Sequence, residues 1–284
     1  MILVTGATGN VGSELVSQLA TAGHNVRALV RSPQGIALPA NVEAVAGDLD
    51  RPQSLAPALE GVRRVFLLGG YRDMPALLAE IRRAGVEHVV LLSSRSVVGG
   101  HPSNAIVRMW MTSEDAARSS GIAWTLVRPS GFASNALRWL PQLRAGDLVR
   151  APFANAPIAS IDPHDIAAVA AVALTSNGHE SRSYALSGPE AQIPARQVDI
   201  LAQVLGRDLR FEAQPDDEAR AELGRSAPPD FVDAFFRFFV KGEFDDAVVL
   251  ATIKELTGQA PRTFEQWARA HLGDFQTTAI GDKR

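Results

Sequence analysis

Three glycines near the beginning of the chain have the spacing of a phosphate-binding turn. Residues 4–12 read Val-Thr-Gly-Ala-Thr-Gly-Asn-Val-Gly, between an apolar strand pattern and an amphipathic helix pattern. Gly6 allows a sharp exit from the strand, Gly9 lets the backbone approach a pyrophosphate, and Gly12 lets the helix pack closely on the sheet. Free N–H groups and the dipole at the helix start would hold the anion. The segment predicts a dinucleotide site, and the alternative is a glycine-rich turn without a ligand.

The end of the second predicted strand indicates which dinucleotide is bound. Enzymes that use NAD usually place Asp or Glu there to bind the ribose hydroxyls. Here the strand reads VRALV and is followed by Arg31 and Ser32, with no acid. A guanidinium group matches a 2′-phosphate in a bidentate way. The sequence therefore predicts NADP(H) as cofactor, and the alternative for Arg31 is a solvated charge on a loop.

Further candidate cofactor residues follow the third, fourth and fifth predicted strands. They are Asp48 and Leu49, Gly69 and Gly70, and Ser93 and Ser94. The aspartate is expected to accept from the adenine amino group while the leucine packs on the ring, although the aspartate could also cap the next helix. The glycine pair would let the backbone lie near a ribose. The serines end a strand at the carboxyl edge, where ligands of open parallel sheets bind.

Alternating strand and helix patterns position these residues. Apolar, β-branched runs occupy 2–5, 25–30, 42–46, 64–68, 88–93 and 124–127, and helical patterns occupy 11–22, 53–59, 75–84 and 104–119. Continuously apolar strands separated by helices are typical of a parallel sheet that is buried on both faces. We therefore expect an α/β fold with a Rossmann-type doubly wound parallel sheet.

The second half of the chain predicts a smaller, mainly helical C-terminal substrate subdomain. Residues 1–154 are assigned to the NAD(P)-binding Rossmann domain, 155–275 to the smaller subdomain, and 276–284 to a flexible tail. Asp162 and Pro163 begin a helix, and this helix and the strand that follows it, within 162–187, are expected to return to the Rossmann domain. A further helix is predicted over 194–205, and Thr263 and Gln266 form a capping box for the last helix.

Composition excludes several classes of protein. The 284 residues contain no cysteine, and the formal net charge is −3. Disulfides and thiolate catalysis are thus excluded, and no broad basic surface is expected for nucleic acid. No apolar run approaches the roughly 20 residues of a membrane helix. No charged leader precedes the first strand, so we expect a cytoplasmic protein. The six histidines lack ligand spacing, so no metal site is expected.

Together, these segments resemble the NmrA-like NAD(P)-binding proteins, an atypical group of the short-chain dehydrogenase/reductase superfamily. The resemblance covers roughly residues 1–272 and rests on TGATGNVG at 5–12, VRALVRSP at 26–33, GDL at 47–49, LLSS at 91–94, SGIAWTLVRPSGFASN at 120–135, DPHDIAAVA at 162–170, YALSGPE at 184–190 and LTGQAPRTFEQWARAH at 256–271. Such proteins include NADPH-dependent reductases of quinones, dyes and plant phenolics, and also redox-sensing regulators. The resemblance implies that Thr8, Gly9, Asn10 and Val11 line the phosphates, and that Pro129, Gly131 and Phe132 lie near the nicotinamide.

The chain departs from the superfamily in its acid–base residues. Short-chain dehydrogenases usually carry Tyr-x-x-x-Lys on the helix after the fifth strand. Neither tyrosine of this chain, Tyr71 or Tyr184, has a lysine four residues later, and the first lysine is Lys241. The corresponding segment is apolar around Trp110. Reduction of ordinary carbonyl compounds is therefore not expected.

The missing pair favours an acceptor that needs little proton assistance. Hydride transfer requires mainly orientation and a dry pocket, because the cofactor carries the reactivity. We therefore predict an NADPH-dependent oxidoreductase acting on an apolar, electron-poor small molecule that is quinone-, enone- or iminium-like. Ser94 or Ser96 could donate a hydrogen bond. His101, on the loop after the fifth strand, is the best titratable candidate for proton delivery, unless it is simply an exposed loop residue.

The substrate pocket and the partners are the least determined features. Candidate pocket residues are Trp110, Phe132, Trp139 and Phe235. The phenylalanine-rich segment 231–239 would either roof an apolar pocket or form the core of the smaller subdomain. Two other functions are compatible with the sequence: a non-catalytic NADP(H)-sensing regulatory protein, and a scaffold repurposed for a non-redox step such as cyclisation or isomerisation. The sequence leaves open whether the chain forms a homodimer or binds a protein partner.

Overall fold

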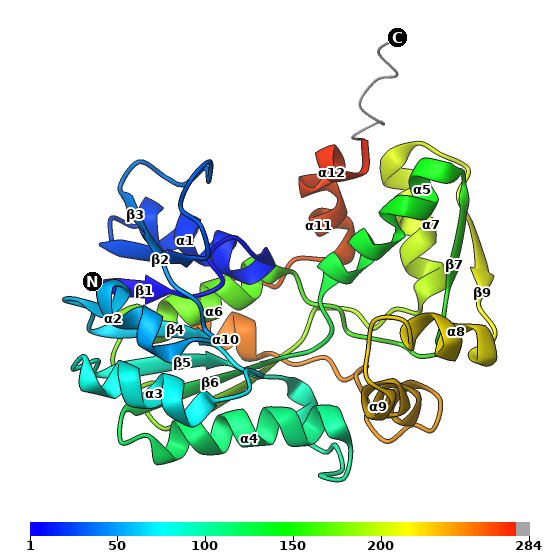
Figure 1. The fold of residues 1–284 in the computed structure, drawn as a ribbon. Helices are drawn as coiled ribbons and strands as arrows, with labels where there is room; N and C mark the ends of the chain where they lie inside the picture. Colours follow the sequence, from blue (N-terminus) through cyan, green and yellow to red (C-terminus); the bar gives the residue numbers. More distant parts are fainter. Residues whose placement is uncertain (277–284) are drawn as a thin grey trace.

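A seven-stranded parallel sheet organises one lobe of the molecule in the computed structural model, which describes residues 1–276 (Figure 1). Its strands are β1 (Ile2–Val4), β2 (Val26–Val30), β3 (Val42–Ala46), β4 (Arg64–Leu68), β5 (His88–Leu92), β6 (Ala123–Pro129) and β8 (Arg182–Leu186). They lie in the order β3-β2-β1-β4-β5-β6-β8, and every neighbouring pair is parallel. The strand order changes direction between β1 and β4, the kind of position at which doubly wound sheets bind ligands. The predicted fold class is confirmed.

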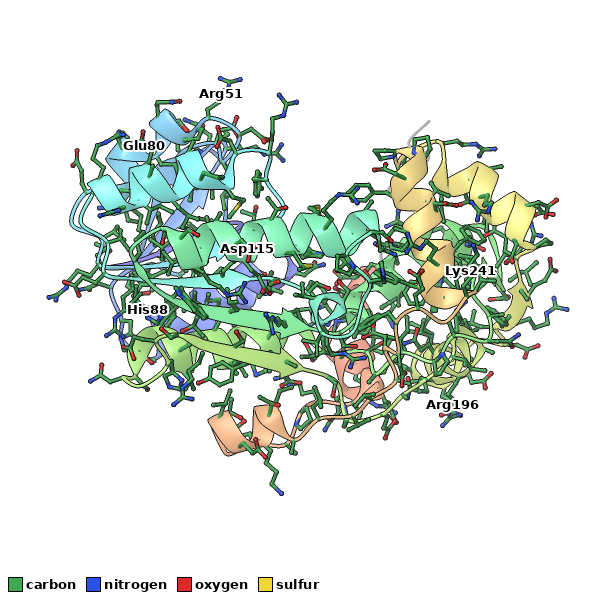
Figure 2. All side chains as sticks on the ribbon, turned by 90° about the horizontal axis from the view of Figure 1, so that it is seen from below. Arg51, Glu80, His88, Asp115, Arg196 and Lys241 are labelled. Atoms are coloured by element: carbon green, nitrogen blue, oxygen red, sulfur yellow. The ribbon has the colours of Figure 1, made fainter. Side chains whose placement is uncertain are left out.

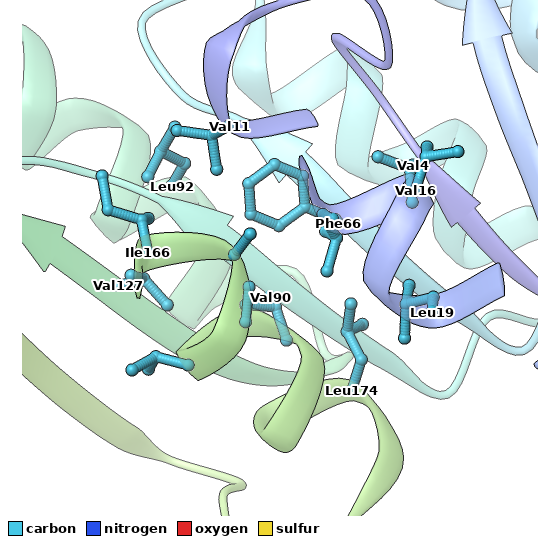
Figure 3. Close-up of a cluster of buried hydrophobic side chains, with 14 of the residues drawn as sticks. Val4, Val11, Val16, Leu19, Phe66, Val90, Leu92, Val127, Ile166 and Leu174 are labelled. Atoms are coloured by element: carbon cyan, nitrogen blue, oxygen red, sulfur yellow. The ribbon is translucent and has the colours of Figure 1, made fainter. Parts of the chain in front are cut away.

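Helices cover both faces of the sheet. One face packs against α1 (Asn10–Thr21), α6 (Pro163–Thr175) and α10 (Thr252–Thr257), and the other against α2 (Ala56–Leu59), α3 (Met74–Arg83) and α4 (Ala105–Ser119). The side-chain alternation of a strand explains the division: on β4, Phe66 belongs to the first face and Val65 and Leu67 to the second. Figure 3 shows Phe66 among Val4, Val11 and Val90, between the strands and the helices of the first face. These strands are buried on both faces, as their continuous apolar runs predicted.

A smaller lobe lies beside the sheet (Figures 1 and 2). It contains α5 (Leu140–Ala145), β7 (Leu148–Ala151), α7 (Pro194–Leu205), β9 (Arg210–Ala213), α8 (Asp216–Leu223), α9 (Pro229–Phe239), α11 (Phe264–Ala270) and α12 (Leu272–Gln276). Strands β7 and β9 pair in parallel. Leu143, Val149, Leu201 and Trp267 are buried together in its core. Short 3-10 helices η1 (Pro52–Leu55), η2 (Arg95–Val97) and η3 (Ala133–Trp139) complete the elements.

The chain divides between the lobes differently from the expected boundary at residue 154. Ala133 and Ala136 of η3 and the buried residues of α5 and β7 already pack in the core of the smaller lobe, so the crossing comes soon after β6. Within 162–187, α6 packs on α1 and β8 pairs with β6, and Ile253 of α10 also returns to the sheet core. The expected tail begins at Gln276, the last residue of α12, and its remainder, 277–284, lies outside the described residues.

No helix in the described part of the chain is both long and apolar enough to cross a membrane.

Candidate functional site

The glycine turn between β1 and α1 combines two structural glycines with one that packing does not demand. Gly6 has a φ of 61°, a conformation that favours glycine. A Cβ on Gly12 would lie 2.1 Å from the carbonyl oxygen of Gly6, so the helix could not approach the turn so closely with any other residue. A Cβ on Gly9 would meet only that same oxygen, at 3.3 Å. Gly9 therefore leaves open space over the helix start, and a ligand can use that space.

The start of α1 has unused hydrogen-bond donors. Helices α3, α4, α6 and α11 are each capped by a side chain, from Asp73, Asn104, Asp162 and Thr263 respectively. Helix α1 has Gly9 at its N-cap and no side-chain cap. The backbone N–H groups of residues 10–12 have no backbone acceptor in the described part of the chain. Such a row of free donors fits a pyrophosphate, which we expect these three N–H groups to hold.

Exposed side chains flank this turn. Thr8 and Asn10 are both exposed, and the Asn10 Nδ2 donates to Ser134 Oγ at 2.9 Å. Ser134 lies on η3, where the chain enters the smaller lobe. Asn10 therefore links the glycine turn to the segment that follows β6, so both sides of the predicted cofactor site are held together.

Arg31 is an uncommitted cation at the carboxyl end of β2. It is exposed, and it has no hydrogen-bond or ion-pair partner within residues 1–276. On the same strand, Arg27 is buried and donates to the carbonyl groups of Ala58 and Glu60. Tyr71, which follows β4, lies near Arg31: burial raises the pKa of the Tyr71 phenol, and the charge of Arg31 opposes that rise. Arg31 is thus free to bind a phosphate, and Tyr71 is a neighbour that the sequence did not single out.

The residues after β3 have mixed roles. Asp48 Oδ1 accepts from the Asp50 N–H at 3.0 Å, so its carboxylate shapes the turn before η1. Asp48 is half-buried, and its second oxygen, Oδ2, lies 3.5 Å from Arg51 Nε. Leu49 is only 7% exposed and packs in the sheet core, and its contact with an adenine ring stays a prediction. Ser32 Oγ donates to Gln34 Oε1 at 2.7 Å.

The glycine pair after β4 accommodates Trp110. A Cβ on Gly69 would lie 2.9 Å from the indole ring of Trp110 and equally close to the Leu92 carbonyl oxygen. Gly70 has a φ of 85° and also faces the ring. Packing of Trp110 therefore explains Gly69, and the positive φ explains Gly70, without a ligand. The indole forms an apolar surface at the carboxyl end of β4.

A buried ion-pair network lies beneath the carboxyl end of β5. Glu114 is fully buried on α4 and accepts from Arg128 through two hydrogen bonds, at 2.7 and 2.6 Å, and from Arg118 at 2.8 Å. Ser93 Oγ donates to Glu114 Oε1 at 2.7 Å. Burial alone would raise the pKa of Glu114, but the hydrogen bonds from Arg128 and Ser93 lower it overall. Ser93 therefore spends its only proton on Glu114 and can act toward a ligand only as an acceptor.

The three candidate proton donors after β5, Ser94, Ser96 and His101, differ in exposure. Ser94 Oγ and Ser96 Oγ are 2.9 Å apart, and Ser94 Oγ also accepts from the Ser96 N–H, so the two serines are hydrogen-bonded to each other. His101 is exposed, and its Nδ1 accepts from the Ser103 N–H at 3.2 Å. Arg237 of α9 also binds Ser103. The structure thus places His101 on an outer loop that leans on the smaller lobe.

A second buried ion pair joins the loops after β5 and β6. Arg95 donates to Asp246 Oδ1 at 3.1 and 2.9 Å, and the Gly131 N–H donates to Asp246 Oδ2 at 3.0 Å. Arg95 and Asp246 are both nearly inaccessible. Burial raises the pKa of Asp246, although the hydrogen bonds oppose the rise. Asp246 follows α9, so the chain leaving the smaller lobe fixes the backbone where the resemblance places the nicotinamide.

The four candidate pocket residues occupy three different clusters. Trp110 and Phe235 pack against the same buried group, which joins the start of α4 to α9. Phe132 is half-buried against the sheet core, next to the buried Pro129 that ends β6. Trp139 packs in the core of the smaller lobe. The structure therefore brings together only two of the four. The ion pairs at Glu114 and Asp246 were missed, and the only sequence signal for the first was an arginine within an apolar strand.

No group of three or more His, Cys, Asp or Glu side chains in residues 1–276 is arranged to hold a metal ion.

Comparisons with known proteins agree with this geometry. A family model described as NAD(P)H-binding matches residues 6–177. The chain is 42% identical over 280 residues to the (4-alkanoyl-5-oxo-2,5-dihydrofuran-3-yl)methyl phosphate reductase of Streptomyces griseus, covering 97% of this chain and 99% of the relative. It is 34% identical to the NAD(P)H azoreductase of Xenophilus azovorans, again covering 97% and 99%.

Solved structures share the fold. The NADPH-dependent quinone oxidoreductase of Escherichia coli, complexed with NADPH, superposes with a TM-score of 0.78 at 23% identity, covering 96% of this chain and 100% of that chain. A negative transcriptional regulator, NmrA, in complex with NADP, gives a TM-score of 0.72 at 19% identity, covering 94% of each chain.

Proposed function

The chain belongs to the NmrA-like family of NAD(P)-binding oxidoreductases, within the atypical short-chain dehydrogenase/reductase superfamily. On that premise, we propose that it is an NADPH-dependent reductase of a conjugated, electron-poor alkene. The substrate class is a 4-alkanoyl-2,5-dihydrofuran-5-one that carries a methyl phosphate. This class is the one named for the relative of 42% identity, which matches along nearly the whole chain.

The observation that carries the proposal is that the polar side chains after β5 either bind a neighbouring side chain or lie on an exposed loop. The Ser93 hydroxyl donates to Glu114, Ser94 and Ser96 bind each other, and His101 lies on an exposed loop. Trp110 packs against Gly69 after β4 and lies in the segment where the resemblance would place the tyrosine of the superfamily. A site built in this way suits an acceptor whose reduction does not depend on a protein acid.

The proposed acceptor meets that requirement. Its ring double bond is conjugated with both the lactone carbonyl and the alkanoyl carbonyl. NADPH, when bound, supplies a hydride, which forms a new C–H bond at the ring carbon that bears the phosphomethyl group. The π electrons move onto the neighbouring carbon and spread over two carbonyl oxygens as an enolate. That enolate is stable enough to form without a protein acid and then take its proton from water. The alkoxide from a simple ketone is too high in energy to form in this way.

The residues of the chain then bind, orient and exclude water. The free N–H groups at the start of α1 bind the pyrophosphate, and Arg31 binds the 2′-phosphate and favours NADPH over NADH. Ser93, held as an acceptor by Glu114, is positioned to accept from the carboxamide of the nicotinamide. Asp246 and Arg95 fix the backbone on either side of that ring.

The test is NADPH oxidation by the purified protein with three acceptors: the alkanoyl dihydrofuranone phosphate, a quinone and an unactivated ketone. We expect turnover of the first, slower turnover of the quinone and none of the ketone. Deuteride from labelled NADPH should appear on the ring carbon that bears the phosphomethyl group. Fast reduction of the ketone, or label on the alkanoyl carbon, would disprove conjugate reduction. Tight NADPH binding without turnover of any acceptor would favour the sensor alternative.

A further inference from the structure

Helix α9 carries a row of phenylalanines that lie at the edge of a buried cluster and keep part of their surface exposed. Val232, Ala234, Phe236 and Phe238 are buried against neighbouring elements. The remaining rings, Phe231, Phe235 and Phe239, recur every four residues and therefore share one face of the helix. All three are only half-buried. We name these three residues the phenylalanine row.

Phe153, on the loop after β7, extends this apolar surface from a second element. Its ring centroid lies 5.1 Å from those of both Phe236 and Phe239. Its backbone has a φ of 58°, which is unusual for a bulky residue. Strained backbone of this kind tends to persist at functional sites, where surrounding contacts hold it. Here the contacts with α9 hold the Phe153 ring against the row.

A continuous chain of contacts connects this surface to the reaction edge of the sheet. Phe239 contacts Phe238, which contacts Phe244. The guanidinium of Arg95, just after β5, lies 4.9 Å from the Phe244 ring centroid. Asp246 binds both Arg95 and the Gly131 N–H. The phenylalanine row and Phe153 are therefore connected to the loop after β5 and the end of β6.

Two further contacts bracket the surface. Trp110, which covers the glycines after β4, packs against the same buried group as Phe235 and Phe239. Ile158, at the end of the loop that begins with Phe153, lies where a side chain on Gly131 would be, with its Cγ2 3.0 Å from that position. The surface thus borders the carboxyl ends of β4, β5 and β6, where the cofactor and the acceptor meet.

We propose that Phe153, Phe235 and Phe239 form the subsite for the alkyl tail of the alkanoyl group. This inference rests on the proposed function, because it assumes an acceptor with a linear acyl chain. These three rings are apolar and uncharged, so they suit a saturated chain. They have no hydrogen-bond donor or positive charge for a phosphate. Half-buried rings can lose further exposed surface when a chain lies along them, and that loss drives binding.

The test measures binding of a chain-length series, from acetyl to octanoyl, of the dihydrofuranone phosphates to the full chain saturated with NADP⁺. The oxidised cofactor prevents turnover, so calorimetry reports affinity alone. We expect affinity to rise about fourfold with each added methylene until the surface is covered. In Phe153→Gly and Phe235→Ala, the rise per methylene should fall below about twofold, with the acetyl compound bound about as well as by wild type.

Two features keep this experiment decisive. Phe153→Gly removes the ring and relieves the positive φ, so loss of folding is not expected. Phe211→Ala is the matched control, because Phe211 is a half-buried ring of the same lobe that packs in a different cluster. An unchanged slope in both variants, no slope in wild type, or an equal loss of slope in Phe211→Ala would overturn the subsite. A normal slope without NADPH oxidation would instead refute the proposed reaction and leave the subsite standing.

Discussion

Replacing Asp165 with asparagine should stabilise the protein at neutral pH. Asp165 lies in the first turn of α6 and is 5% exposed. Its Oδ2 accepts from the Arg262 N–H at 2.7 Å, a bond that an asparagine oxygen can keep. Burial, with the nearby charge of Asp162, raises the pKa of Asp165 from 3.8 to about 6. The folded state therefore holds an ionised carboxylate at neutral pH in surroundings that disfavour it.

The sign and size follow from proton linkage. Because the folded pKa is raised, the folded state binds more protons than the unfolded chain between the two pKa values. The stability that protonated Asp165 contributes is fully present below 3.8 and is lost as the pH rises through about 6. A shift of about two pKa units corresponds to about 3 kcal/mol. Asp165→Asn should therefore match wild type in acid and exceed it by up to about 3 kcal/mol above pH 7.

Urea unfolding of wild type and variant, from about pH 4 to above pH 7, measures this difference. Comparing the two proteins at each pH cancels the titration of the other carboxyl groups. Asp115→Asn is the control, because Asp115 is an exposed aspartate on α4. A free energy of unfolding for Asp165→Asn that follows the wild-type pH dependence would refute the reasoning, as would a variant less stable than wild type at neutral pH.

Three further predictions concern the cofactor and the proton. Arg31→Glu should weaken NADPH binding about ten- to a hundredfold and change NADH binding much less, because a charge-assisted contact with the 2′-phosphate is lost. Calorimetry with both cofactors measures the two affinities, and equal losses for NADPH and NADH would contradict the prediction. Gly9→Val should abolish NADPH binding while thermal unfolding stays near wild type, whereas Gly12→Val should also lower the melting temperature, because only its Cβ meets backbone at 2.1 Å. His101→Ala should keep kcat/KM for the dihydrofuranone within about tenfold, and a larger loss would make His101 a catalytic acid.

Local patterns were enough to predict the sheet lobe. The inner strands, such as β2 and β5, are buried on both faces, so each reads as a short apolar run, and glycines or capping residues mark where most helices end or begin. The two strands of the smaller lobe were missed for the opposite reason. β7 and β9 have four residues each, and most residues of β9 are exposed. Their composition reflects the loops around them, and they form only because the lobe brings residues 148–151 and 210–213 together.

The cofactor half of the candidate site could be inferred from the sequence, because it is local. The glycine turn, the helix start and Arg31 all lie within 31 residues of the N-terminus, and their roles follow from the conformations that those residue types allow. Leu49 shows the limit of this reasoning. The sequence places it at the correct strand end, but only the packing of the sheet shows how much of its side chain is buried in the core.

The catalytic half depends on contacts between residues far apart in the chain, and these decide what the serines after β5 can do. Ser93 reads in the sequence as a free hydroxyl, yet it lies 21 positions before the carboxylate that takes its proton. The Asp246 that fixes Gly131 and Arg95 comes more than a hundred residues later, after the smaller lobe has been built. Each pairing replaces a hydrogen bond to water with one to a buried charge, and only the folded topology determines which partner is near. The absence of the Tyr-x-x-x-Lys pair could be read from the tyrosines and lysines, whereas the hydrogen bond that commits the Ser93 proton to Glu114 required the structure. That hydrogen bond supports the proposed acceptor, whose reduction leaves a stabilised anion.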